Sequence, residues 1–456
     1  MEFFPILLGV VLIIAIVYRL MRSSNGAKNV GQSQSETRRL VDVLSGDAEC
    51  CVRESIAWNG STPAEVLSRL SSDSEASVRI GVAQNENTSK TSLEILSKDV
   101  DLSVRREVAS NKNTPRHVLE MLIADDSSDL ASSTASFAAQ NPNISPGVLR
   151  NYVTRVLMRV EREQGGGSAG YVELWGIAAN PSMPQDALEI LLTKCPTIKE
   201  YDAKNIKHGI ASNPGASLKL LSLLAQDDSP YVRYGLETNP QAPQSVLRIC
   251  YKMYGADEHL AENRNTPQDI IEKCAHNENV RIRAAAARNT SAAADTLSIL
   301  ASDSNEDVRG TVAQNPNTPQ ELVERLSLDE SEYVRSCVAK NPMITHAIAE
   351  GLVVDKGRVR EGLALNPSVS EDILDRLSKD ENEEIRVCVA HNRSASPETL
   401  REMITTKEFP LCIDIITGIA ENPNAPSGIL RSLSRSDLYL IREAVAHNPR
   451  IIGIEA

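Results

Sequence analysis

The sequence predicts an all-α fold, namely an α-solenoid of about fifteen short two-helix repeats of about 26 residues each, preceded by one transmembrane helix. Three observations lead to the repeat fold. One segment recurs along most of the chain, and helix-start signals stand at a fixed place within it. Aromatic residues make up only 4 % of the composition, against 41 % hydrophobic residues overall. A core of small aliphatic side chains suits short helices that pack closely.

The recurring segment reads V-R-x-x-V-A-x-N-x-N-T-P-x-x-L-x-x-L-S-x-D, as in residues 78–99, 104–125 and 308–329. Its first Asn marks the register of each copy, and the commonest spacing is 26 residues, as from 59 to 85. A unit of this size cannot cover its own apolar face, so neighbouring units must stack into a continuous core. The register residues are Asn59, Asn85, Asn111, Asn141, Asn180, Asn213, Asn239, Asn263, Asn289, Asn315, Asn341, Asn366, Asn392, Asn422 and Asn448.

Each unit carries signals for two helices. Thr62, Pro63 and Glu65 fit a capping box in which the Thr side chain caps a helix that begins at the Pro. The Leu pattern that follows predicts a first helix of about nine residues with one buried face. The V-R-x-x-V-A segment predicts a second, shorter helix, of either α or 3₁₀ geometry, that ends near the register Asn.

The repeat resembles that of the leucine-rich repeat variant family and, more distantly, the HEAT-like helical repeats, over about residues 47–450. The resemblance implies two short helices per repeat, one of them often 3₁₀, wound into a right-handed superhelix. Most units here are slightly longer than is typical of the family, and several lack the Arg. Some relatives carry an iron–sulfur module, but the eight cysteines form no cluster of suitable spacing, so we expect no cofactor.

Outside the repeats, composition divides the N-terminus in two. Residues 3–18 are apolar and are followed at once by Arg19 and Arg22, which predicts a transmembrane anchor over residues 1–22. A cleaved signal peptide is the alternative, disfavoured because Glu2 is the charge before the apolar run. Residues 23–36 are polar and predict a flexible tether. The positive charges after the span predict a single-pass inner (cytoplasmic) membrane protein of bacterial type, with its solenoid in the cytoplasm.

The solenoid is expected to occupy residues 37–456, with insertions near 151–170, 193–206 and 404–412, where the register spacing expands. A net charge of −13 argues against nucleic acid as a partner. The seven histidines are scattered, without a metal-binding motif or a catalytic constellation. We therefore expect no catalytic, metal-binding or cofactor-binding residue, and no enzyme activity.

One Arg recurs in most units, usually with an Asp six residues before it. Stacked repeats would align these side chains into a structural ladder, each guanidinium bridging carboxylates or turn carbonyls of adjacent units. A groove for a phosphopeptide or acidic ligand is the alternative. The ladder residues are Arg53, Arg79, Arg105, Arg233, Arg283, Arg309, Arg335, Arg360, Arg386 and Arg442.

Candidate partner-binding residues come from the irregular parts of the array. Arg155, Arg159 and Arg162 form a basic stretch in an acidic chain, and Tyr201 lies in the second insertion. The alternative is a longer helix that bends the solenoid. Trp58 precedes a register Asn, where other units carry polar residues, so it is either an exposed interface aromatic or a cap on the first repeat.

Together these features predict a membrane-anchored protein–protein interaction scaffold that binds a protein or peptide on the solenoid surface. Two other classes remain open. One is an enzyme or cofactor-linked helical-repeat protein, which would need a cleft with convergent titratable groups. The other is a mechanical spacer without a specific ligand.

Overall fold

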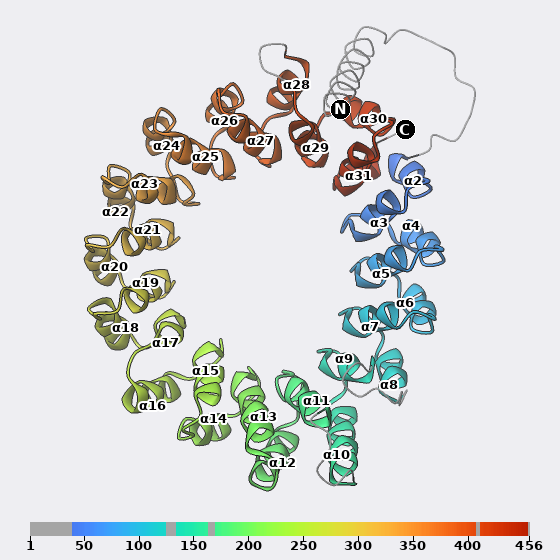
Figure 1. Ribbon diagram of the computed structural model, residues 1–456, viewed down its shortest axis with the longest axis vertical. Coiled ribbons are helices and arrows are strands. Elements are labelled where there is room, and N and C mark those ends of the chain that lie inside the picture. The colour runs from blue at the N-terminus through green and yellow to red at the C-terminus, as the bar shows by residue number, and fades with distance from the viewer. Residues whose placement is uncertain (1–38, 125–133, 163–168, 407–410, 455–456) are drawn as a thin grey trace, which may run out of the picture. The chain divides into compact units, whose positions relative to one another are not determined.

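The computed structural model describes residues 39–124, 134–162, 169–406 and 411–454 (Figure 1). The regular elements of this part are α-helices with two short 3₁₀ turns, which confirms the predicted all-α repeat fold. The backbone divides into two compact units. Unit 1 contains the described residues up to Ser89 and from Val323 onward, and unit 2 contains those from Lys90 to Leu322.

Unit 1 is built from the first and last repeats of the chain. Its helices are α2 (Leu40–Leu44), α3 (Cys50–Trp58), α4 (Ala64–Leu70), α5 (Ala76–Gln84), α23 (Glu332–Ala339), α24 (His346–Leu352), α25 (Gly357–Leu365), α26 (Glu371–Leu377), α27 (Glu383–His391), α28 (Pro397–Thr405), α29 (Ile413–Glu421), α30 (Ser427–Leu433), α31 (Tyr439–His447) and the 3₁₀ turn η3 (Ile451–Gly453). Helix α22 (Gln320–Leu326) spans the boundary between the units.

Unit 2 is built from the central repeats. Its helices are α6 (Lys90–Leu96), α7 (Leu102–Ser110), α8 (Arg116–Ala124), α9 (Thr134–Gln140), α10 (Pro146–Arg162), α11 (Ala169–Ala178), α12 (Gln185–Lys194), η2 (Cys195–Thr197), α13 (Glu200–Ser212), α14 (Leu218–Leu224), α15 (Pro230–Thr238), α16 (Gln244–Tyr254), α17 (Glu258–Glu262), α18 (Gln268–Ala275), α19 (Val280–Arg288), α20 (Ala294–Leu300) and α21 (Glu306–Gln314).

Each repeat contributes one helix to each of two layers. In Figure 1 the V-R-x-x-V-A helices, such as α5 and α19, line the concave side of their unit, and the helices that follow the T-P pair line the convex side. The predicted lengths are reversed, because α5 has nine residues and α4 has seven. The V-R-x-x-V-A helices are α-helical, which resolves the choice left open by their sequence.

The predicted capping box is wrong in its hydrogen bonds. Pro63 is the N-cap of α4, and no side chain caps this helix. The Thr62 hydroxyl is buried and donates to the carbonyl of Ile56, at 2.7 Å. The Thr therefore closes the turn after the concave-side helix, where it satisfies a carbonyl that the helix leaves without an internal partner.

The register Asn does more than close its own turn. Its Oδ1 accepts the N–H two residues further on, as at Asn85, where Asn87 donates at 2.9 Å. Its Nδ2 donates to two carbonyls of the preceding repeat, those of Ala57 at 2.7 Å and Asn59 at 2.9 Å. The amide thus satisfies three backbone groups, and its two bonds to the preceding repeat are buried away from water. The Asn thus fixes the spacing of adjacent concave-side helices.

Within unit 1 the first repeat stacks on the last one. Asn59 donates from Nδ2 to the carbonyls of Ala446 and Asn448, at 2.8 and 2.9 Å, the same contacts that adjacent repeats make. The Leu40 N–H donates to the carbonyl of Ile454 at 2.8 Å. Helix α3 therefore packs against α31 in the register of a consecutive repeat.

Two predictions need correction. The fold class included a transmembrane helix, and the predicted location was a single-pass membrane protein. None of the helices in the described residues is long and apolar enough to cross a membrane. The longest of them, α10, has 17 residues and includes four arginines, whereas a span needs about 20 apolar residues. The predicted anchor (1–22) and tether (23–36) lie outside the described residues.

The three expected insertions correspond to the following elements. Residues 151–162 extend α10 to twice the usual length, and residues 163–168 lie outside the described part. Residues 193–206 include the end of α12, the turn η2 and the start of the 13-residue α13. In the third region, α28 ends at Thr405, and residues 407–410 are not described.

Candidate partner-binding surface

Four aromatic side chains of unit 2 follow one another from repeat to repeat. Trp175, His208 and Tyr234 each stand five residues before a register Asn, on α11, α13 and α15. His259 stands four residues before the next register Asn, on α17. These helices line the concave side of unit 2 (Figure 1). We call these four residues the aromatic row.

The rings of the aromatic row are in contact along its length. Ring centroids lie 6.1 Å apart between Trp175 and His208, 5.7 Å between His208 and Tyr234, and 4.7 Å between Tyr234 and His259. The middle pair is stacked, and the last pair meets edge to face. Both arrangements are favourable for aromatic pairs. His208 is further held by Nδ1, which donates to the Tyr231 carbonyl at 2.8 Å.

Glycines explain why the rings meet. A Cβ on Gly209 would lie 2.5 Å from the Trp175 carbonyl oxygen, and one on Gly235 would lie 2.9 Å from the His208 carbonyl oxygen. Any larger residue at these positions would push the helix away from its neighbour. The close approach of α11, α13 and α15 is therefore encoded by glycine, and it brings the aromatic side chains of successive repeats within contact distance.

The row remains open to solvent. Trp175, Tyr234 and His259 are exposed, and His208 is half-buried. Beyond His259, the concave side becomes charged, since Glu262 accepts from Arg288 at 3.1 Å. A shallow pocket of about 330 Å³ adjoins this end and is lined by His259 and Glu262 among others. Exposed aromatic surface of this extent is typical of a binding surface.

Beneath the row lies a buried acidic side chain that the repeat pattern does not predict. Glu237 occupies the position where the other units carry Ala, and it is only 1 % exposed. Its Oε1 accepts from Arg233 Nε at 2.8 Å, and Arg233 also pairs with Asp257 at 2.6 Å. The carbonyl of Glu237 accepts from the register Asn263 at 2.6 Å, so the residue also serves the repeat interface.

Burial controls the protonation of this side chain. Desolvation, and then the neighbouring Asp257 carboxylate, raise the pKa of Glu237 to about 8, against the opposing effect of Arg233. At neutral pH Glu237 is therefore largely protonated. The cluster then carries one cation and one anion.

Two of the predicted partner-binding residues have internal contacts. Arg155 donates to the Ile123 carbonyl at 2.6 Å and lies over the Tyr152 ring. Arg159 pairs with the buried Glu173 carboxylate at 2.7 Å. Both arginines are half-buried between helices of unit 2. Arg162 is the last residue of α10, but the position of its side chain is outside the described part.

The two predicted aromatic contacts are exposed. Tyr201, the second residue of α13, is 67 % exposed. Trp58 ends α3 in unit 1 and is 45 % exposed, with its ring over Gly81 of the next repeat. A Cβ on Gly81 would lie 3.0 Å from the indole, so glycine again makes room for an aromatic side chain of the preceding repeat.

The repeated arginines connect adjacent repeats. Arg283, for example, donates from Nε and Nη2 to the two oxygens of Asp303, at 2.6 and 3.0 Å, and from Nη1 to the carbonyls of Asn277 and Glu278. The carboxylate is thus the Asp of the following repeat, and the carbonyls belong to the turn before the Arg. The same pattern occurs at Arg53, Arg335 and Arg442, the last of these with Asp47 of the first repeat.

Sequence reasoning missed His208, Tyr234 and His259, because the histidines were judged only as scattered residues without a metal-binding motif and Tyr234 was not considered. The signal was present in the register, since three of the four row residues stand at the same distance from their register Asn. A comparison of the non-consensus positions, unit by unit, would have found it. The same comparison would have found Glu237, an acidic residue at the position two before the register Asn, where the other repeats carry Ala.

Comparison with known proteins agrees with the repeat. A family model described as leucine rich repeat variant matches residues 306–331. A solved structure described as a leucine-rich repeat variant with a novel repetitive protein structural motif is similar at 20 % identity and a TM-score of 0.32, over 49 % of this chain and 88 % of that one. No match was found among curated proteins. The family match within an array of helical repeats confirms the predicted resemblance.

Proposed function

We propose that this array of leucine-rich-repeat-variant units is an interaction scaffold, and that the aromatic row on the concave side of unit 2 binds an extended, basic segment of a partner protein. The observation that carries the proposal is the row itself. Four rings from four successive repeats are in contact and solvent-accessible. Aromatic side chains supply much of the binding energy at protein interfaces.

The chemistry of the row favours a cationic partner. The face of a Trp or Tyr ring attracts an Arg or Lys side chain, with about 0.5–2 kcal/mol per contact. Glu262 lines the pocket at the His259 end, where its carboxylate is paired with Arg288, and a basic side chain of the partner would share or displace this pairing. An extended segment could therefore place successive basic side chains over the rings and into this pocket.

Overall charge supports the same choice. The chain carries a net charge of −13, which attracts basic segments and repels acidic ones at a distance. The Arg ladder does not oppose this preference, because guanidinium groups such as that of Arg283 are already bound to carboxylates and turn carbonyls. These internal bonds also weigh against the alternative of an acidic-ligand groove.

Binding of short labelled peptides to the full chain, followed by fluorescence anisotropy, tests the proposal. One peptide alternates arginine with serine, a second alternates glutamate with serine, and a third alternates glutamine with serine. We expect binding of the arginine peptide alone. Tyr234→Ala removes the central ring of the row, and we expect its affinity to be about tenfold lower.

Tyr201→Ala is the matched control, because Tyr201 is an exposed tyrosine of the same unit that makes no ring contact with the row among the described residues. Its affinity should equal that of the unchanged protein. Equal affinities for the arginine and glutamate peptides, or an undiminished affinity in Tyr234→Ala, would contradict the proposal.

The proposed activity is binding without catalysis. Among the described residues, Glu237 is an acidic side chain with a raised pKa, but it is only 1 % exposed and is paired with Arg233, which leaves little of its carboxyl open to a substrate. A mechanical spacer, the remaining alternative, needs no exposed row of aromatic side chains.

A further inference from the structure

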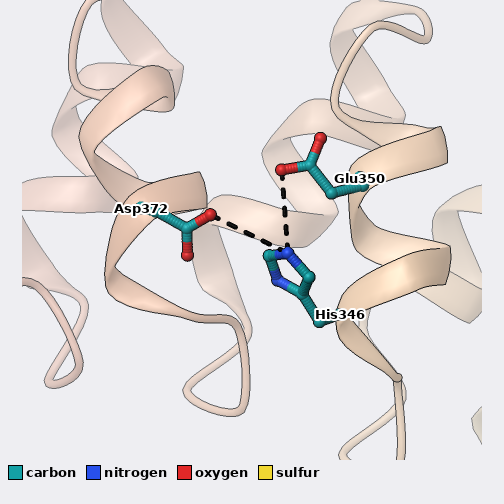
Figure 2. Close-up of side chains that lie close together, drawn as sticks. All are labelled: His346, Glu350 and Asp372. Carbon is teal, nitrogen blue, oxygen red and sulfur yellow. Dashed lines mark ion pairs between the residues drawn. The ribbon is translucent and has the colours of Figure 1, made fainter.

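We propose that His346, Glu350 and Asp372 of unit 1 form a binding site for a divalent transition-metal ion of the Zn²⁺ class, which joins two adjacent repeats. His346 and Glu350 lie one turn apart on α24, and Asp372 lies on α26 of the next repeat (Figure 2). The three side chains point toward a common centre. An imidazole with two carboxylates is a donor set that suits zinc and its neighbours in the first transition row.

The spacing of the ligand atoms fits one ion. His346 Nε2 lies 3.9 Å from Glu350 Oε1 and 4.0 Å from Asp372 Oδ2, and one ligand atom from each residue lies within 4.8 Å of the others. Two ligands of one tetrahedral zinc ion are roughly 3.4 Å apart. Small side-chain rotations therefore suffice to bring the three atoms into coordination, since all three side chains are at least 41 % exposed.

Ser370 prepares the imidazole for this role. It is the N-cap residue of α26, yet its side chain does not cap that helix, unlike Ser396 at the N-cap of α28. Its Oγ lies 3.1 Å from His346 Nδ1 instead. With the proton on Nδ1 donated to Ser370, Nε2 presents its lone pair to the two carboxylates. Outer contacts of this kind orient metal-binding histidines and fix their tautomer.

A neighbouring arginine orients one of the two carboxylates. Arg376 Nη1 donates to Glu350 Oε2 at 2.7 Å, which leaves Oε1 toward His346. The two carboxylates together balance the charge of a divalent ion, and Arg376 adds one positive charge beside Glu350.

A simple ion pair does not account for this geometry. His346 Nε2 lies near 4 Å from one carboxylate oxygen of each of two residues, which is beyond the hydrogen-bond distance of about 3 Å. His117 shows the difference, because its Nε2 lies 3.1 Å from the single carboxylate of Glu94. The separated arrangement at His346 leaves space at the centre for an ion.

Zn²⁺ titration of the full chain against a chromophoric chelator tests the site. We expect His346→Ala and Asp372→Asn each to lose one equivalent of Zn²⁺ that the unchanged protein binds. Ser370→Ala should keep this equivalent but bind it about tenfold more weakly, because the outer contact alone is lost. Mg²⁺ should not compete, since it prefers oxygen ligands in an octahedral shell.

Two control variants address other histidines. His117→Ala removes a histidine that has one carboxylate partner. His447→Ala removes a histidine whose Nδ1 lies 3.8 Å from Glu421 Oε1, and the other oxygen of Glu421 lies 3.8 Å from His391 Nε2. Both should retain the equivalent that His346→Ala loses. Circular dichroism spectra identical to that of the unchanged protein would show that the variants are folded. An unchanged zinc stoichiometry and affinity in His346→Ala, or no zinc bound by the unchanged protein, would overturn the proposal.

Discussion

At the scale of single residues, Glu237 makes the stability of the fold depend on pH. Its carboxyl is neutral when buried at neutral pH but ionises in the unfolded chain, since its pKa is raised from 4.5 to about 8. Between these values the native state binds more protons than the unfolded state, so the free energy of unfolding falls as pH rises. The stabilisation is complete below about pH 4.5 and is lost through about pH 8.

Glu237→Gln should remove this part of the pH dependence. The amide is neutral at every pH and has nearly the same size and shape as the protonated carboxyl. Urea unfolding should give similar stabilities for the two proteins near pH 5, and a variant more stable by a few kcal/mol near pH 8. Parallel stability profiles for the variant and the unchanged protein would refute the protonation assigned to Glu237.

A second prediction at the scale of single residues compares how much a largely buried and an exposed ion pair contribute to stability. Arg283 and Arg248 both form bidentate pairs, with Asp303 and Asp269 respectively. The first pair is 15 % and 9 % exposed and the second 52 % and 49 %, and only Arg283 also binds turn carbonyls. Arg283→Ala should therefore lower the free energy of unfolding by about 2–3 kcal/mol, and Arg248→Ala should lower it much less.

Chemical denaturation of both variants, at one pH and salt concentration, checks this prediction. Asp303→Ala should resemble Arg283→Ala, and the double variant should cost less than the sum because the two residues act as one unit. Equal losses for Arg283→Ala and Arg248→Ala would mean that the repeated Arg is a surface pair without a special role.

At the scale of elements, glycine decides how closely the concave-side helices approach. Gly209→Ala would place a methyl group 2.5 Å from the Trp175 carbonyl, so α13 and α11 must separate. We expect a loss of about 1–3 kcal/mol in the free energy of unfolding, and weaker binding of the arginine peptide because the row is interrupted. Thermal unfolding and anisotropy measure the two effects.

Gly147→Ala is the control for this prediction. Gly147 lies in α10 of the same unit, and a Cβ there would meet nothing within 4 Å. Alanine should be neutral or slightly stabilising at this position, because it has the higher helix propensity. Comparable destabilisation by both substitutions would indicate that close helix approach at Gly209 does not matter.

The elements were largely predictable from sequence, because the signals for them are local. The Leu pattern, the T-P pair and the register Asn all lie within one repeat, so the sequence of each repeat is enough to predict its two helices. The hydrogen bonds that close the turns and join one repeat to the next were harder to predict. Thr62 was expected to cap its own helix, but it bonds Ile56 of the helix before, and the two alternatives have the same sequence pattern.

Contacts between neighbouring repeats explain why the sequence alone did not reveal the candidate site. Whether Trp175 touches His208 depends on the helix separation set by Gly209, which no single-unit pattern describes. Arg155 and Arg159 were expected on the surface because charge predicts exposure on average. Their partners, the Ile123 carbonyl and Glu173, lie in other helices and draw both side chains inward.

At the scale of the whole molecule, the described chain forms two compact units, one of which unites both ends of the array. Arg442 on α31 pairs with Asp47 of the first repeat, at 2.8 Å and 3.1 Å. The last and first repeats of unit 1 thus use the same Arg–Asp and Asn contacts that join consecutive repeats. A terminal repeat in a solenoid ordinarily exposes one face to solvent, but here each covers the other.

Asp47→Ala should therefore loosen both ends of the array together. We expect faster amide hydrogen exchange in α3 and in α31, which lie almost 400 residues apart in sequence, since each loses part of its covering neighbour. Asp303→Ala, the same change in unit 2, should increase exchange in α19 and α21 and leave α31 unchanged. If exchange in α31 were unaffected by Asp47→Ala, the stacking of the two terminal repeats would not hold in solution.

The central claim, that the aromatic row binds a basic segment, is tested most directly by the fluorescence of Trp175. The chain has two tryptophans, so Trp58→Phe leaves Trp175 as the only one. Titration with the arginine–serine peptide should change the emission of Trp175 and saturate at the concentration that saturates anisotropy. An emission spectrum that stays constant while the peptide binds would place the binding site elsewhere and contradict the account.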